Sequence, residues 1–310
     1  NIFAQPGGNV ETAALLSIRA LQGGYIQQAD ATLTESLPLL YAVRSFSGHK
    51  ESIVGIGYSP DGKYILTGSL DGTAKLWDAS TGAELRTIIG HTDRVCDVAY
   101  SPDGKYILTG SYDATAKLWD AFTGAEVRSF TGHTDVVTCV AFSPEGKYVL
   151  TGSLDGTAKL WEIVTGVELH SFELHYGQEC GAAAFTPDGN YILIGHQSEA
   201  TLYKAPWETE YKKQEYNETT WIESLAISPD GKTFLTGTYD TATLRDVETG
   251  TIIRTFPGHQ DGVTSVAFSP DGKYVLTGGG DATAKLWDAS SGTELRSFSG
   301  HTGPVSAVAF

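Results

Sequence analysis

The stretch IVGIGYSPDGKYILTGSLDGTAKLWDASTGAELRTIIGH, residues 53–91, contains four short β-rich segments separated by turn residues such as Pro60-Asp61-Gly62 and Thr81-Gly82. Apolar and polar residues alternate within the segments, a pattern that predicts antiparallel strands. The stretch recurs along the chain, and the proline of its first turn returns at separations of 42, 42, 43, 42 and 41 residues. These prolines are Pro60, Pro102, Pro144, Pro187, Pro229 and Pro270. A period near 42 with four strands per repeat predicts an all-β propeller built of four-stranded blades.

Two dipeptide signatures recur in phase with this period. A Gly-His pair marks the start of repeats at Gly48-His49, Gly90-His91, Gly132-His133, Gly258-His259 and Gly300-His301. A Trp followed by an acidic residue ends the third strand at Trp77-Asp78, Trp119-Asp120, Trp161-Glu162 and Trp287-Asp288. With these motifs the chain resembles the WD40-repeat family over residues 41–310. The resemblance implies a β-propeller whose flat faces bind other molecules.

Four repeats carry His, Thr, Asp and Trp at constant offsets. The sets are His49, Thr67, Asp71 and Trp77; His91, Thr109, Asp113 and Trp119; His133, Thr151, Asp155 and Trp161; and His259, Thr277, Asp281 and Trp287. The resemblance implies that each set is a hydrogen-bonded structural tetrad inside one blade. A hydrolase triad uses similar residue types, but an enzyme needs it once, so four copies favour architecture over catalysis.

Histidines one repeat apart should lie in different blades and should not converge on one metal ion. We therefore expect no catalytic, metal-binding or cofactor-binding residue in this chain.

The two ends of the repeat region match single strands. YAVRSFSGH, residues 41–49, matches the fourth-strand segment of other repeats, and GPVSAVAF, residues 303–310, matches a first strand. Six full repeats plus the first and last strands of a seventh predict a seven-bladed WD40 propeller, closed by the N-terminal strand and incomplete at its C-terminus. Either the native chain continues, or the seventh blade is completed from elsewhere.

Residues 1–40 have a different pattern. NVETAALLSIRAL, residues 9–21, has apolar residues at helical spacing and is followed by Gly23-Gly24, and residues 27–40 repeat the pattern more weakly. This predicts a short N-terminal α-helical hairpin, a separate linker before the propeller at 41–310. It resembles the helical linker that precedes WD40 arrays in large bacterial signalling proteins.

The fourth and fifth repeats depart from the consensus. Tyr203 and Arg245 stand near the Trp position, and Asn217 or Glu218 stands roughly where the fifth His should be. Because the network has lost members there, we expect these blades to be less rigid at their loops. The intervening segment mixes aromatic and cationic residues, as binding surfaces do. It makes Trp207 and Tyr211 candidate partner-binding residues, the alternative being an outer strand packed on the neighbouring blade.

A second candidate surface lies on the turn between the second and third strands. The residue before the turn Asp is Leu70, Tyr112, Leu154 or Tyr239 in four of the repeats, and Arg94 lies in a neighbouring loop. The family resemblance implies that this turn faces outward at one end of the propeller. Exposed Tyr and Leu side chains around a ring are typical of a protein-binding patch. The alternative is that they are ordinary propeller surface.

Charge and composition exclude several classes of function. The chain has 37 acidic and 21 basic residues and a net charge of −16, which argues against nucleic-acid binding. No apolar run is long enough to span a membrane. Cys96, Cys139 and Cys180 lack metal-ligand spacing and are interpreted as small buried hydrophobic residues.

Together these features predict a non-enzymatic protein–protein interaction scaffold or sensor module, part of a larger bacterial signalling protein in the cytoplasm. Its partner would be a protein or peptide, and further domains would be covalently linked to it. Two alternatives stay open: a structural or oligomerisation element of a larger assembly, and an enzyme that uses the propeller channel.

Overall fold

The computed structural model describes residues 46–174, 180–205, 212–218 and 220–310. These residues form 24 strands in six antiparallel sheets of four strands each. We call the sheets blades one to six in chain order. Within each blade, consecutive strands pair in sequence order. Blade one contains β1 (Ile53–Tyr58), β2 (Tyr64–Ser69), β3 (Ala74–Asp78) and β4 (Glu84–Ile88); blade two β5 (Val95–Tyr100), β6 (Tyr106–Ser111), β7 (Thr115–Asp120) and β8 (Glu126–Thr131); blade three β9 (Val137–Phe142), β10 (Tyr148–Ser153), β11 (Thr157–Glu162) and β12 (Glu168–Glu173).

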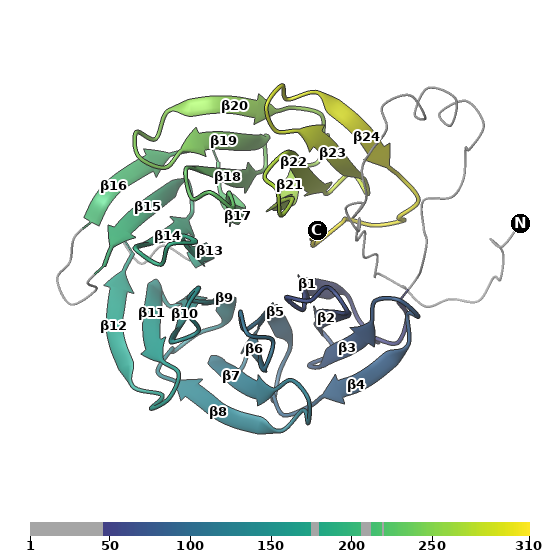
Figure 1. The fold of residues 1–310 in the computed structure, drawn as a ribbon, viewed down its shortest axis with the longest axis vertical. Helices are drawn as coiled ribbons and strands as arrows, with labels where there is room; N and C mark the ends of the chain where they lie inside the picture. Colours follow the sequence, from purple (N-terminus) through teal and green to yellow (C-terminus); the bar gives the residue numbers. More distant parts are fainter. Residues whose placement is uncertain (1–45, 175–179, 206–211, 219) are drawn as a thin grey trace, which may run out of the picture.

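The second half of the chain repeats this arrangement. Blade four contains β13 (Cys180–Phe185), β14 (Tyr191–His196), β15 (Glu199–Lys204) and β16 (Lys212–Asn217); blade five β17 (Ile222–Ile227), β18 (Thr233–Thr238), β19 (Ala242–Asp246) and β20 (Ile252–Phe256); blade six β21 (Val263–Phe268), β22 (Tyr274–Gly279), β23 (Ala284–Asp288) and β24 (Glu294–Phe298). The first strand of each blade faces the centre of the ring and the fourth lies at its perimeter (Figure 1).

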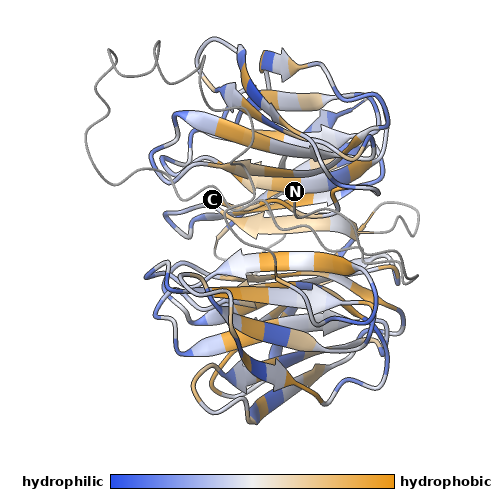
Figure 2. Cartoon of the chain, turned by 90° about the vertical axis from the view of Figure 1, so that its right-hand side faces the viewer, coloured by the Kyte–Doolittle hydropathy of each residue, from blue (hydrophilic) through white to orange (hydrophobic). Residues whose placement is uncertain are grey.

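Local turn chemistry explains why each repeat folds into hairpins. In the first turn of blade one, Ser59 Oγ and the backbone N–H of Lys63 both donate to Asp61 Oδ1, at 2.7 and 3.1 Å. The next residue, Gly62, has φ +67°, a conformation that glycine adopts without steric cost. Polar turns of this kind alternate with apolar strands, so hydrophilic residues gather at the edges of the propeller (Figure 2).

The hydrophobic core lies mainly between blades. One cluster joins Leu118 and Phe130 of blade two to Val149 and Trp161 of blade three. A side chain at Gly110 would clash with the blade-three valines, since a Cβ there would lie 2.9 Å from Val140 Cγ1. Glycine at this point of the second strand therefore lets neighbouring blades pack closely.

Arginine side chains at the perimeter also join neighbouring blades. Arg86 of β4 donates from Nη1 to Thr123 O and from Nη2 to Phe122 O, both at 2.6 Å. Arg128 of β8 makes the same pair of bonds to the turn of blade three, and Arg254 to that of blade six. Each of these turns is thus held by the blade before it.

The prediction of seven blades is wrong, because the described residues form six. The described residues of the segments expected to build the seventh blade instead pack on blades one and six. Phe46 contacts Trp77 with ring centroids 5.8 Å apart, and the backbone N–H of Val308 donates to Ser265 Oγ at 3.0 Å. Since the sequence holds no counterpart of the two middle strands, no four-stranded ladder forms between these segments in the described part of the chain.

The predicted helical hairpin at residues 1–40 lies outside the described residues, and the described residues contain no helix. Contacts between first strands run in chain order, from β1 to β5 and onward to β21. The C-terminal end of the chain lies at the inner edge of the ring, between β21 and β1 (Figure 1).

Candidate functional site

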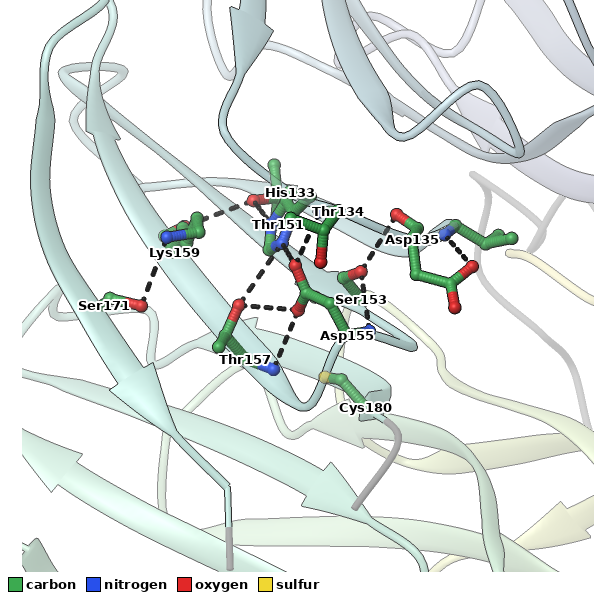
Figure 3. A network of polar contacts seen from close by, with 12 residues as sticks. His133, Thr134, Asp135, Thr151, Ser153, Asp155, Thr157, Lys159, Ser171 and Cys180 are labelled. Atoms are coloured by element: carbon green, nitrogen blue, oxygen red, sulfur yellow. Dashed lines mark hydrogen bonds and ion pairs between the residues drawn. The ribbon is translucent and has the colours of Figure 1, made fainter. Parts of the chain in front are cut away.

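The His, Thr, Asp and Trp of blade three form a continuous hydrogen-bonded network. Figure 3 shows its His133, Thr151 and Asp155. His133 Nδ1 lies 2.8 Å from Asp155 Oδ2, and its Nε2 lies 2.7 Å from Thr151 Oγ1. Trp161 Nε1 donates to the same Thr151 oxygen at 2.9 Å. The backbone N–H of Thr134 donates to Asp155 Oδ2 at 3.0 Å. The network therefore ties the loop before β9 to the turn between β10 and β11.

The same geometry recurs in blades one, two and six. The His Nδ1 to Asp distances are 2.9, 2.8 and 3.0 Å for His49, His91 and His259. The Nε2 to Thr distances are 2.8, 2.6 and 2.8 Å. In each blade the Trp N–H donates to the Thr oxygen at 2.9 Å. The structure thus brings together all four residues of each set. The sets are His49, Thr67, Asp71 and Trp77; His91, Thr109, Asp113 and Trp119; and His259, Thr277, Asp281 and Trp287.

The tetrads are too buried for substrate chemistry. The threonines that would serve as nucleophiles have no exposed surface, as for Thr67 and Thr151 at 0%. Burial lowers the pKa of His49, His91 and His133, which keeps these imidazoles neutral. Each of these threonine oxygens already accepts the Trp N–H and lies beside an imidazole. The arrangement joins the loop, the turn and the strands of a blade, and it leaves the threonine without exposed surface.

The tetrad carboxylates stay ionised inside the blades. Burial alone would raise the pKa of Asp71, Asp113 and Asp155, but hydrogen bonds from a threonine hydroxyl, a backbone N–H and the imidazole outweigh it and lower each pKa. The same balance lowers the pKa of Asp281 to about 2. Each turn is therefore fixed by a charge-assisted hydrogen-bond network.

Blade five replaces the tetrad with a buried ion pair that the sequence pattern did not reveal. Thr236 Oγ1 donates to Glu218 Oε1 at 2.6 Å, and Arg245 Nε donates to the same oxygen at 2.8 Å. The side chains of Arg245 and Glu218 are 9% and 5% exposed. Glu218 precedes Thr236 by 18 residues, the same offset as His49 before Thr67. That shared offset is the signal that identifies Glu218, and not Asn217, as the residue in the His position.

Blade four fills the same places differently. Ile194 occupies the threonine position of β14 and is fully buried. Tyr203 occupies the Trp position of β15 and packs against Phe172 with ring centroids 4.7 Å apart. His175, the expected His of this blade, lies outside the described residues. Blade four therefore has the packing of Tyr203 on Phe172 at the position where other blades have the hydrogen bond from Trp to Thr.

The predicted rim residues lie at one end of the blades. Leu70, Tyr112 and Leu154 lie on turns that a tetrad holds. Tyr239 lies on the corresponding turn of blade five, which has no tetrad, and Arg94 lies in the loop before β5. We call Leu70, Arg94, Tyr112, Leu154 and Tyr239 the rim surface. Tyr112 and Tyr239 are 41% and 67% exposed, whereas Leu70 and Leu154 are half-buried. Arg94 lies against Tyr112, with its guanidinium carbon 5.5 Å from the ring centroid, and its carbonyl accepts the Tyr112 N–H at 2.9 Å. The two other predicted binding residues, Trp207 and Tyr211, lie outside the described residues.

A pair of exposed apolar residues at the opposite end of the blades was missed. Phe122 and Val164 are 86% and 78% exposed, on the turns after β7 and β11. The corresponding residues of blades one and six are Ser80 and Ser290. An apolar residue at a position that is Ser80, Glu248 or Ser290 in other blades is the signal that could have identified them.

The described residues hold neither a metal-binding cluster nor a membrane-spanning helix. In this part of the chain, no three or more His, Cys, Asp and Glu side chains are grouped so that they could bind a metal ion. Nor does any helix in it have the length and apolar character needed to cross a membrane.

Comparison with known proteins agrees with this architecture. A family model described as IFT122 first beta-propeller matches residues 52–222, more than half of the chain. The chain belongs to this family of WD40-repeat β-propellers. A second model, WD domain, G-beta repeat, matches residues 211–242 and 250–288.

Individual relatives match over short segments. Protein Mut11 of Chlamydomonas reinhardtii is 38% identical over 63 residues, 19% of this chain and 17% of that protein. The protein LST8 homolog of Dictyostelium discoideum is 53% identical over 34 residues, 11% of each chain. The probable E3 ubiquitin ligase complex SCF subunit sconB of Penicillium rubens is 38% identical over 47 residues, 15% of this chain and 7% of that protein. The chain therefore aligns with less than a fifth of each relative.

Proposed function

We propose that this chain is a protein-interaction scaffold and that its rim surface binds a protein or peptide partner. The observation that carries the proposal is the exposure of Tyr112 and Tyr239, at 41% and 67%, at the same end of the propeller. Aromatic side chains supply large contact areas and are enriched where binding energy is concentrated. No catalytic role is proposed, since the polar sets inside the blades are structural.

Tyr112 is held in place before any partner arrives. Tyr112 directly precedes Asp113, whose carboxylate accepts hydrogen bonds from His91, the Thr92 N–H and Thr115. A residue on such a turn loses little conformational freedom on binding, so more of its contact energy is available for affinity. Arg94 restricts the Tyr112 ring further by stacking against it.

Charge near the rim surface favours a partner with cationic side chains. Asp93, Asp135 and Asp261 are exposed in the loops that lead into β5, β9 and β21. They lie on a chain whose net charge is −16. Binding through this end is therefore expected to weaken as salt concentration rises.

The relatives support a scaffold role without naming a partner. One of them, sconB, is described as a subunit of a ligase complex. We extend to this chain only the role of a subunit that holds other proteins. A place in a bacterial signalling protein and a cytoplasmic location, both predicted above, gain no support from the relatives, which come from Chlamydomonas, Dictyostelium and Penicillium.

The test is photo-crosslinking from the rim surface. A benzophenone amino acid replaces Tyr112 or Tyr239, and in a matched control it replaces Phe122 at the other end of β7. We expect both rim positions to crosslink one common partner, and the Tyr112→Ala/Tyr239→Ala variant to lose capture of that partner. Equal capture by the double variant, or crosslinks from Phe122 alone, would refute the assignment. Crosslinks only to a second copy of the chain would favour an oligomerisation element.

A further inference from the structure

Two of the three cysteines meet at the boundary between blades three and four. Cys139 lies in β9 and Cys180 begins β13, and their sulfur atoms are 3.7 Å apart. Both are free thiols, 6% and 0% exposed. Cys96 lies in β5 of blade two. The two thiols are therefore in van der Waals contact across a blade boundary.

The space for both sulfurs is provided by Gly152 of β10. A Cβ at this glycine would lie 2.3 Å from Cys180 Sγ and 2.6 Å from Cys139 Sγ. At the equivalent glycine of blade two, Gly110, the corresponding neighbours are the side chains of Val137 and Val140. The boundary between blades three and four thus has two oxidisable thiols beside its glycine, whereas the boundary between blades two and three has valine side chains there.

We propose that Cys139 and Cys180 are a modification site, at which a low-molecular-weight disulfide such as oxidised glutathione produces an intramolecular disulfide. One cysteine, as thiolate, attacks a sulfur of the oxidant and releases one small thiol. The other cysteine then attacks the protein-bound sulfur and releases the second small thiol. The two cysteines lose two electrons and two protons, and the oxidant becomes two thiols. The new bond joins β9 of blade three to β13 of blade four.

Burial makes this reaction dependent on opening of the boundary. The contact with Cys180 and burial both raise the pKa of the Cys139 thiol, so little thiolate exists in the closed structure. Once formed, the bond connects residues 41 positions apart in the sequence. Closing a loop of this length restricts the unfolded chain and stabilises the folded one. The disulfide therefore acts as a staple that holds blades three and four together.

The experiment uses the full chain with oxidised glutathione. Remaining thiols are alkylated, and the protein is digested with trypsin and examined by mass spectrometry. We expect peptide 129–147 linked to peptide 160–204, two hydrogen atoms lighter than their sum, and Cys96 left outside any such link. The thermal unfolding midpoint should rise by about 5 °C on oxidation and return on reduction.

Three variants control the result. Cys139→Ser introduces the residue that β21 carries at this position, Ser265, and Cys180→Val introduces the residue of β9, Val137. Both are expected to fold, as checked by circular dichroism, and to lose the link and the shift in midpoint. Cys96→Ser should keep both. Glutathione adducts without the link would overturn the proposal, as would unmodified thiols after incubation just below the unfolding midpoint, where the boundary opens.

Discussion

Arg245 donates from Nε to Glu218 Oε1 at 2.8 Å, in the places that Trp and His occupy in four other blades. The guanidinium also donates to Gly250 O and Asn217 O, at 3.0 and 2.8 Å. Both side chains are buried, so the pair is satisfied only as long as each partner is present. Blade five therefore joins the loop before β17 to strands β18 and β19 through an ion pair, where other blades use a tetrad.

Removing one member of this pair should destabilise the protein strongly. Glu218→Ala leaves the Arg245 charge buried without its carboxylate, which is expected to cost about 3–5 kcal/mol in the free energy of unfolding. Urea denaturation measures this loss. The double variant Glu218→His/Arg245→Trp rebuilds the tetrad residues beside Thr236 and Asp240, and should recover most of the stability. Similar losses in the single and double variants would show that the two positions do not act as a unit.

The repeat explains how much of the fold could be predicted. Turn residues such as Pro60 and Gly62 and the alternating strands predict blades. The recurring His and Trp pairs carry the resemblance to the WD40 family, and that resemblance implies the tetrads. The number of blades could not be obtained in this way, because a strand-like segment such as 303–310 also packs on a neighbouring blade without a sheet of its own. Local pattern specifies a strand, whereas its pairing depends on partners elsewhere.

The site was less accessible to sequence reasoning where repeats deviate. At Glu218 and Arg245 the repeat pattern indicates lost network members, because comparison of repeats detects identical residues and not two substitutions that compensate each other. The contact between Cys139 and Cys180 depends on a missing side chain at Gly152, which becomes visible only when neighbouring blades are placed. Tyr239 is more exposed than Tyr112, at 67% against 41%, and this difference likewise depends on tertiary packing.

Asp97 should limit stability at neutral pH. Its carboxylate accepts the backbone N–H groups of Val98 and Val140, across the boundary between β5 and β9, at 2.8 and 2.9 Å. Burial raises its pKa from 3.8 to about 6, against the lowering effect of these hydrogen bonds. The folded state therefore favours protonated Asp97. The contribution of Asp97 to folding stability is present at low pH and is lost as pH rises through about 6.

Serine occupies the equivalent position in blades five and six, where Ser224 and Ser265 accept the same type of backbone N–H at 3.1 and 3.0 Å. Asp97→Ser is expected to raise the free energy of unfolding at pH 7.5 by about 1–2 kcal/mol, and to change it little at pH 4. Urea titrations at both pH values measure the difference. A loss of stability at pH 7.5 would mean that the ionised carboxylate is well accommodated.

The tetrad histidines should make the protein acid-sensitive. Burial lowers the pKa of His49, His91 and His133 below 6.5, so the unfolded chain binds protons first as pH falls. The contribution of these neutral histidines to folding stability is complete above pH 6.5. It is lost as pH falls below 6.5 and through the pKa values that the histidines have in the folded state. We therefore expect the free energy of unfolding to decrease as pH falls below 6.5. Measuring the urea midpoint from pH 8 to pH 5 tests this, and a flat profile would contradict it.

Thr151→Val should separate the network from the shape of blade three. Valine matches threonine in size, but it removes the oxygen that accepts the Trp161 N–H and lies beside His133 Nε2. Both groups are then left without a partner in a position with 0% exposure, at a cost of about 2–4 kcal/mol. Thr138→Val in β9 is the control, since Thr138 belongs to no tetrad and its Oγ1 donates to the backbone oxygens of Gly152 and Cys180. If both variants lose the same stability in urea, the tetrad oxygen has no special role. A larger loss for Thr151→Val, with crosslinking from Tyr112 in blade two unchanged, would show that each tetrad acts within its own blade.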